Sequence, residues 1–172
     1  MKPNPTDTLC TQCGLCCDGS LFADVELANT DEASALEVMG LAIEDGEGDE
    51  EELLLQPCRA LRGKRCSIYA HRPDCCRTFE CKLLQEVKRG MLGVEVAQKR
   101  IAQVLARIGH IKELLVRLGS KVEELPLKER CAEALEIPAA ASASPATNRT
   151  QAELFTAMKA VEQLIRETFL SR

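Results

Sequence analysis

The residue type in this sequence that is best suited to chemistry is cysteine, because nine of its ten cysteines lie within the first 81 positions. They form three clusters, which are Cys10, Cys13, Cys16 and Cys17, then Cys58 and Cys66, and then Cys75, Cys76 and Cys81. Closely spaced thiols either hold a metal or pair as disulfides. Residues 1–10 lack the basic start and apolar stretch of a secretory signal, and no apolar run is long enough to cross a membrane. We therefore expect a cytoplasmic protein whose thiols hold metal in a reducing compartment.

The first cluster has the spacing of a metal-binding loop. Cys10, Cys13 and Cys16 repeat a gap of two residues, so that one tight loop can direct several thiolates at a metal, and Gly14 gives the loop backbone freedom. Structural zinc sites use such a C-x2-C pair, and a bacterial ferredoxin uses three cysteines at this spacing with a remote fourth thiolate. The ferredoxin's fourth cysteine followed by proline is missing from this loop. The expected cofactor is Zn²⁺ or Fe, with a [4Fe-4S] cluster as one form of the iron.

Two pairs of cysteines are adjacent in sequence, Cys16 with Cys17 and Cys75 with Cys76. Neighbouring side chains diverge, so we predict that the two members of a pair do not both bind one mononuclear ion. If eight thiolates are used, two four-thiolate sites are the simplest partition. Each such site has a net charge of about −2, whether it holds zinc or an oxidised cubane cluster.

Charge is distributed unevenly along the chain. The net charge of −5 argues against broad nucleic-acid binding. The segment from Cys58 to Lys82 nevertheless holds seven basic and two acidic residues, a local net charge of +5. These cations either form an ordinary solvated surface or stabilise metal-bound thiolates, whereas nucleic-acid contact would lack aromatic residues that stack on bases. The acidic segment 44–52 is typical of a solvated loop.

Short elements are predicted around the cysteines. Residues 21–27 alternate as in a strand, and the apolar period of residues 30–43 predicts a helix. Residues 53–56 and 66–69 are predicted as two further strands with a turn region between them. A proline then precedes a helical turn that we predict over residues 75–84.

The second half of the chain has a clear helical period. Apolar residues recur at three- and four-residue steps over residues 94–118, which predicts a long amphipathic helix with Gly119 as its carboxy-terminal cap. A shorter helix is predicted over residues 127–135. A capping-box pattern at Thr150 and Glu153 then predicts the start of a final amphipathic helix.

The predicted fold class is therefore α+β and mainly α, with a small cysteine-rich metal-binding lobe that contains short strands, followed by amphipathic helices. We divide the chain into a cysteine-cluster metal-chelating domain (1–83), a helical buttress (84–137), an Ala-, Ser- and Pro-rich linker (138–149) and a carboxy-terminal amphipathic helix (150–172). The apolar stripe of the last helix faces either the core or a protein partner.

The order of motifs in the first half resembles a known family. The motifs are Cys10-x2-Cys13-Gly14-x-Cys16-Cys17, Pro57-Cys58-x2-Leu61, Gly63, Cys66-x-Ile68-Tyr69, Arg72-Pro73, Cys76-Arg77-x-Phe79 and Cys81. Over residues 8–83 they resemble the CxxCxxCC cysteine-cluster family of zinc- or iron-chelating (YkgJ-type) domains. The resemblance implies a bacterial cytosolic protein. It also implies metal ligands at Cys10, Cys13, Cys16, Cys17, Cys58, Cys66, Cys76 and Cys81.

Some residues depart from that pattern or stand beside it. Cys75 is outside the family pattern, and Cys76 is favoured over it because Cys76 precedes Arg77-Thr-Phe79. His71 is expected to be a surface or supporting donor rather than a ligand, because eight better-matched thiols are available. Arg72, Arg77 and Tyr69 are candidates for donors near the thiolates, with salt-bridge and core roles as the alternative. Cys131 and His110 are expected to be a buried small hydrophobe and a polar helix position, respectively.

Three classes of function follow from these residues. The leading one is a metal-binding protein, with a protein partner at the carboxy-terminal helices and no membrane or nucleic-acid partner. The alternatives are a zinc-stabilised interaction module and a redox or methyl-transfer-related enzyme with an iron-sulfur centre. A related cysteine cluster occurs in flagellin lysine methylases, but this chain is much shorter and has no Gly-rich nucleotide loop after a clear strand. No catalytic constellation is identified, so the sequence favours a protein that is not an enzyme.

Overall fold

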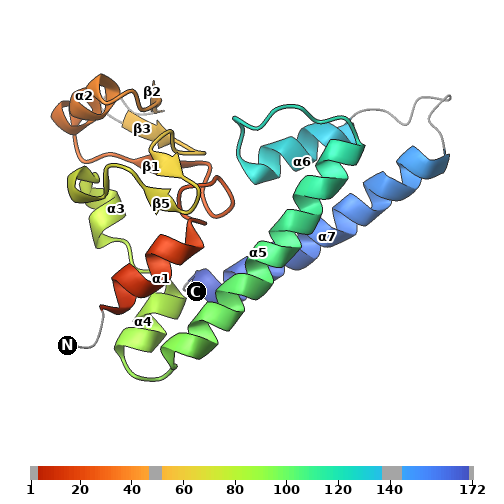
Figure 1. Cartoon of the computed structure of the whole chain (residues 1–172). Helices are drawn as coiled ribbons and strands as arrows, with labels where there is room; N and C mark the ends of the chain where they lie inside the picture. Colours follow the sequence, from red (N-terminus) through yellow and green to blue (C-terminus); the bar gives the residue numbers. More distant parts are fainter. Residues whose placement is uncertain (1–3, 47–51, 137–144, 171–172) are drawn as a thin grey trace. The chain divides into compact units, whose positions relative to one another are not determined.

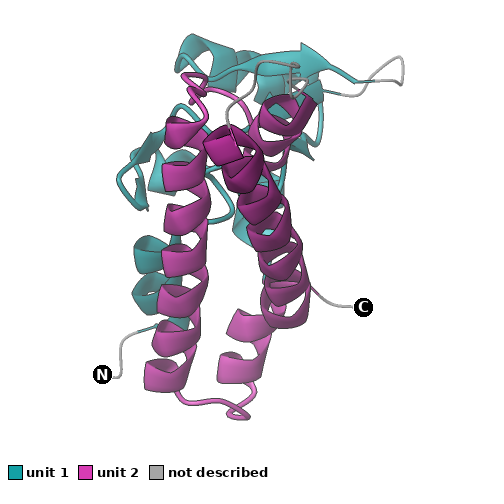
Figure 2. Cartoon of the chain, turned by 90° about the vertical axis from the view of Figure 1, so that its right-hand side faces the viewer, with its two compact units in different colours: residues 1–80 teal, residues 81–172 magenta. Residues whose placement is uncertain are grey.

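The computed structural model of the 172-residue chain describes residues 4–46, 52–136 and 145–170. The chain divides into two compact units, Met1–Glu80 (unit 1) and Cys81–Arg172 (unit 2), which are coloured separately in Figure 2. The described residues form seven α-helices and five short strands, so the prediction of an α+β, mainly α fold is confirmed. Figure 1 shows that the strands belong to unit 1 and the long helices to unit 2.

Unit 1 opens with helix α1, Pro5–Cys13, where the sequence had predicted a tight loop around the first cysteines. Three local signals explain the helix. The Asn4 side chain caps its amino terminus by accepting a 3.1 Å hydrogen bond from the Thr6 N–H, and Pro5 occupies the first helical position. Gly14 ends the helix in the left-handed conformation, with φ of 75°. Cys10 and Cys13 are therefore helical residues.

A three-stranded antiparallel sheet forms the centre of unit 1. Its strands are β1 (Asp24–Glu26), β2 (Ile43–Asp45) and β3 (Glu52–Leu55), in the order β1-β3-β2. Leu54 of the middle strand pairs with a residue of each neighbour and is 1% exposed. The predicted strand over residues 21–27 is thus reduced to three residues.

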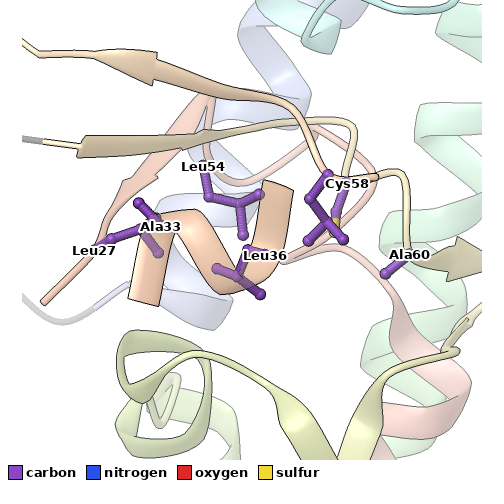
Figure 3. Packing of buried hydrophobic residues seen from close by; sticks show 7 residues of the cluster. Leu27, Ala33, Leu36, Leu54, Cys58 and Ala60 are labelled. Atoms are coloured by element: carbon purple, nitrogen blue, oxygen red, sulfur yellow. The ribbon is translucent and has the colours of Figure 1, made fainter. Parts of the chain in front are cut away.

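Helix α2, Thr30–Val38, supplies the other side of the core of unit 1. Asn29 caps it by accepting a 2.9 Å hydrogen bond from the Glu32 N–H. The helix ends at Val38, because Met39 is its cap and Gly40 follows with φ of 83°. Figure 3 shows its buried side chains packed with those of the sheet and the following loop. This cluster consists of Leu27, Ala33, Leu36, Leu41, Leu54, Cys58 and Ala60.

Short elements complete unit 1. They are the hairpin β4 (Leu61–Arg62) and β5 (Arg65–Cys66), the 3-10 turn η1 (Tyr69–His71) and helix α3 (Asp74–Thr78). The helical turn predicted over residues 75–84 is in fact broken between two helices. The break arises because the backbones of Phe79 and Cys81 are extended.

Helices are the only regular secondary structure among the described residues of unit 2. Its helices are α4 (Lys82–Lys88), α5 (Val94–Arg117), α6 (Leu127–Glu136) and α7 (Pro145–Phe169). Helices α5 and α7 lie side by side in Figures 1 and 2. The buried residues of α5 recur at three- and four-residue steps, and Gly119 follows with φ of 82°, as predicted. The Lys82 ammonium donates a 2.9 Å hydrogen bond to the Glu167 carbonyl oxygen and so joins α4 to the end of α7.

The start of α7 corrects one prediction. Thr150 was expected to cap this helix, but the helix begins at Pro145, and the Thr150 hydroxyl donates to the Ala146 carbonyl oxygen at 3.0 Å inside it. Proline is well suited to a first turn because its missing N–H would have no helical partner there. Most of the predicted linker lies outside the described residues. None of the described helices is long and apolar enough to span a membrane.

Candidate metal centre

All ten cysteines of the chain are described, and all are thiols rather than disulfides. Seven of the eight predicted ligands lie in unit 1, and Cys81, which caps α4, is the first residue of unit 2. Within unit 1 the thiols come from four segments: α1 and the turn after it, the loop after β3, strand β5, and helix α3.

Backbone hydrogen bonds bring three of these segments together. The Cys58 N–H donates to the Cys17 carbonyl oxygen at 2.8 Å, which attaches the first cysteine loop to the loop after β3. The Leu61 N–H donates to the Cys58 carbonyl oxygen at 2.9 Å, and Leu61 pairs directly with Cys66 across the hairpin. These bonds hold Cys17, Cys58 and Cys66 close to the β4–β5 hairpin.

The electrostatics of these thiols reflect their proximity. The pKa of Cys17 is raised to about 12. Burial is the main cause, and the neighbouring Cys58 and Cys66 thiols add to it. Burial also raises the pKa of Cys58, with a smaller contribution from Cys66. Three thiolates so close to one another repel, and burial adds a desolvation cost. A bound cation would offset both effects.

Helix α3 adds two thiols whose sulfur atoms are in contact. The Cys75 and Cys76 Sγ atoms are 4.0 Å apart, so the prediction that adjacent cysteines diverge is wrong for this pair. The hydrogen bond between the two thiols lowers the pKa of Cys75 and raises that of Cys76. Burial and the charges of Cys75, Cys17 and Cys58 raise the pKa of Cys76 further, so Cys76 lies within electrostatic reach of the hairpin thiols.

We call these five residues the central thiol group: Cys17, Cys58, Cys66, Cys75 and Cys76. Cys58 belongs to the buried cluster of unit 1, as Figure 3 shows, and Cys17, Cys66 and Cys75 pack against that cluster. Apolar side chains therefore line one side of the central thiol group, and this low-dielectric surrounding strengthens the interactions between charges in the group.

The donor chemistry of the central thiol group fits zinc and iron, which both accept thiolate ligands. Nevertheless, among the described residues no three His, Cys, Asp or Glu side chains are arranged to hold a metal ion as they stand. The segments that carry the thiols lie together, but the sulfur atoms would have to approach one another more closely to bind a metal ion.

The first cluster lies close to the hairpin through Gly14. A Cβ atom at this position would come within 3.3 Å of the Lys64 Cα atom, so the loop between Cys13 and Cys16 needs glycine for space as well as for its φ of 75°. Helix α1 is also tied to η1, because the Tyr69 hydroxyl donates to an Asp7 carboxylate oxygen at 3.1 Å. Cys10, Cys13 and Cys16 stay predicted ligands, on α1 and the turn that follows it.

The predicted supporting donors separate into two kinds. The Arg72 guanidinium carbon lies 3.7 Å from the centre of the Tyr69 ring, and its positive charge lowers the pKa of Cys17. Arg77 instead forms a 3.2 Å ion pair with Asp74, in which both side chains are more than half exposed. His110 pairs with Glu153 in unit 2, where no thiol of the central group lies.

Sequence reasoning missed Asp7 and Glu32. Glu32 accepts hydrogen bonds from the Ala28 N–H at 3.0 Å and from the Asp74 N–H at 2.8 Å, so it connects the start of α2 to the start of α3. The spacing of Asn29 and Glu32 resembles a capping box and signals the local bond. The contacts with Asp74 and Tyr69 span 42 and 62 positions, and no local pattern announces them.

Comparison with known proteins gives one match. Residues 9–102 match the family model CxxCxxCC, described as "Putative zinc- or iron-chelating domain", which covers more than half of the chain. No curated protein and no solved structure matches the chain.

Proposed function

Since the chain belongs to the CxxCxxCC family of zinc- or iron-chelating domains, we propose that it is a cytoplasmic protein that binds zinc or iron at the central thiol group through Cys17, Cys58, Cys66 and Cys76. The proposal is supported by backbone hydrogen bonds that hold the segments of Cys17, Cys58 and Cys66 together, and by the packing of these three cysteines in or against the buried cluster of unit 1. The charges of Cys17 and Cys58 raise the pKa of Cys76, which indicates that Cys76 lies near them. Thiols buried together carry a cost as thiolates that a divalent cation would offset.

Cys76 is chosen over Cys75 because it directly precedes Arg77 in the motif that carries the family resemblance, and the charges of Cys17 and Cys58 raise its pKa. Cys75 then serves as a hydrogen-bond partner of a ligand. Cys10, Cys13, Cys16 and Cys81 stay ligands that the family resemblance implies.

The proposed site is closed, because four thiolates fill a tetrahedral ion and leave no open position for a substrate. Bound zinc would add folding free energy to unit 1, whereas an iron-sulfur centre would supply a site for electron transfer.

The test is elemental analysis and visible absorption of protein purified without oxygen. We expect stoichiometric zinc in a colourless protein, or iron with acid-labile sulfide and a broad visible band. The variant Cys58→Ala should lose at least one equivalent of metal. Cys131→Ala is the matched control, because Cys131 is a buried cysteine of unit 2 and should be dispensable for metal. Wild-type protein without stoichiometric metal, or Cys58→Ala with its full metal content, would overturn the proposal.

A further inference from the structure

Arg72 is a half-buried cation whose described contacts include no carboxylate. Its Nε–H donates to the Tyr69 carbonyl oxygen at 3.1 Å, and an Nη1–H donates to the Cys76 carbonyl oxygen at 3.4 Å. The Tyr69 ring covers one face of the guanidinium. The carbonyl oxygens and the ring face carry only partial negative charge, so these contacts orient the guanidinium without neutralising it.

A partly desolvated charge needs a counter-charge. The groups around Arg72 that can supply one are the thiols and Asp7, whose carboxylate already accepts a hydrogen bond from the Tyr69 hydroxyl. The Arg72 charge lowers the pKa of Cys17, and the Cys76 backbone carbonyl oxygen accepts a hydrogen bond from the same guanidinium. Four thiolates around a divalent ion leave a net charge of about −2. Metal loading would therefore create the negative charge that Arg72 lacks.

Other cations of the basic segment do not have this position. Arg77 already pairs with Asp74 at 3.2 Å, and the Arg62 guanidinium is exposed and donates to the Arg59 and Leu61 carbonyl oxygens. Arg72 differs from these two arginines in being half-buried, although the charge of Arg62 also lowers the pKa of Cys58.

From this geometry we propose that Arg72 is a positioning residue that balances the charge of the metal-loaded central thiol group, held in place by the Tyr69 ring and by the Tyr69 and Cys76 carbonyl oxygens. The inference rests on the proposed metal binding. It assigns Arg72 a role in how tightly metal is held, and no role as a ligand.

The experiment measures zinc affinity by competition with a chromophoric chelator for the full-length wild type, Arg72→Gln and Arg72→Lys. Arg77→Gln is the matched control, because Arg77 is a nearby arginine whose charge is already paired with Asp74. We expect Arg72→Gln to weaken zinc binding by about 10–100-fold, the usual range for residues that support a metal ligand. Arg72→Lys should recover most of that loss because it keeps the charge. Arg77→Gln should change affinity by less than about threefold, since exposed ion pairs contribute little.

Cobalt(II) substitution gives a second readout that a purely structural role would leave unchanged. At saturating cobalt, the thiolate-to-metal absorption band of Arg72→Gln should be displaced from that of the wild type, whereas Arg77→Gln should superimpose on it. The variant Tyr69→Leu removes the ring and keeps the charge, so it should lose less affinity than Arg72→Gln, and it serves if Arg72→Gln does not fold.

The outcomes separate the two proposals. If wild-type protein binds no zinc or cobalt, the proposed function fails. If wild-type protein binds both but Arg72→Gln binds as tightly, metal binding stands and the role of Arg72 is overturned. Equal weakening in Arg72→Gln and Arg72→Lys, or in Tyr69→Leu, would also overturn it, because the loss would follow packing and hydrogen bonding rather than charge.

Discussion

The Cys58 N–H donates a 2.8 Å hydrogen bond to the Cys17 carbonyl oxygen, which fixes the main chain beside two candidate ligands that are 41 positions apart. Regular secondary structure contributes little at this point, because Cys17 lies in the turn after α1 and Cys58 in the loop after β3. The backbone sets the distance between the segments, and the side chains retain the rotational freedom to close on a metal.

The two adjacent cysteines of α3 should differ in how much they contribute to metal affinity. We expect Cys76→Ser to weaken zinc binding by more than about a hundredfold, beyond the range typical of residues that only support a ligand. Cys75→Ser should bind within about tenfold of the wild type, because serine keeps a hydrogen-bonding group beside Cys76. Competition titration of both variants checks this, and the reverse order would make Cys75 the ligand.

The stability of the metal-free protein should fall at alkaline pH. The pKa of Cys17 is raised from 9.0 to about 12, so folding favours its protonated form. The contribution of this thiol is therefore fully present below pH 9 and is lost as pH rises from 9 toward 12. Denaturant unfolding between pH 8 and 10, followed by the fluorescence of the single tyrosine, should show a smaller loss for Cys17→Ala than for the wild type. Equal losses of stability in Cys17→Ala and the wild type would show that groups other than Cys17 cause the alkaline destabilisation.

Two glycines provide a matched test of the close approach at the first cysteine loop. Gly14 and Gly40 have φ of 75° and 83°, so alanine at either position incurs the left-handed penalty of about 1–2 kcal/mol. Only at Gly14 does the new Cβ atom meet another segment, the Lys64 backbone at 3.3 Å. Gly14→Ala should therefore lower the free energy of unfolding more than Gly40→Ala does, and it should also weaken metal binding. If Gly14→Ala and Gly40→Ala lose the same free energy of unfolding in chemical denaturation, the contact between position 14 and the Lys64 backbone is not tight.

The core beneath the thiols should be sensitive to truncation of Leu54. This residue is 1% exposed at the centre of the sheet, so Leu54→Ala should lower the free energy of unfolding of unit 1 by about 2–5 kcal/mol. Val38→Ala is the control, because Val38 is 89% exposed, and it should cost less than about 0.5 kcal/mol. Urea denaturation of both variants distinguishes the two positions, and a small effect of Leu54→Ala would mean that metal, rather than packing, dominates the stability of unit 1.

Sequence patterns predicted the helical unit better than the thiol-bearing unit, for physical reasons. The period of α5 is set by one apolar face over 24 residues, so its start and the glycine that follows its Leu118 cap are readable locally. Unit 1 depends on strands of two to four residues, whose pairing is decided by distant partners. Helix α1 was readable from Asn4, Pro5 and Gly14, but the cysteine spacing favoured a loop.

The candidate site was predictable by residue type and not by arrangement. Cysteine spacing and the family resemblance selected the thiols, and the matched family model confirms the family. The contact between the Cys75 and Cys76 sulfurs depends on side-chain rotation in a five-residue helix. The position of Arg72 depends on Tyr69, which is in turn held by Asp7 across 62 positions, so neither could be inferred from local sequence.

The hydrogen bond from Lys82 to the Glu167 carbonyl oxygen joins residues 85 positions apart and closes unit 2 from its first helix to its last. Unit 1, in contrast, contains only residues that precede position 81. During synthesis, domains generally fold as units from the amino terminus onward. The residues of the central thiol group therefore leave the ribosome well before α7 does, so the proposed metal binding would not have to wait for translation to end.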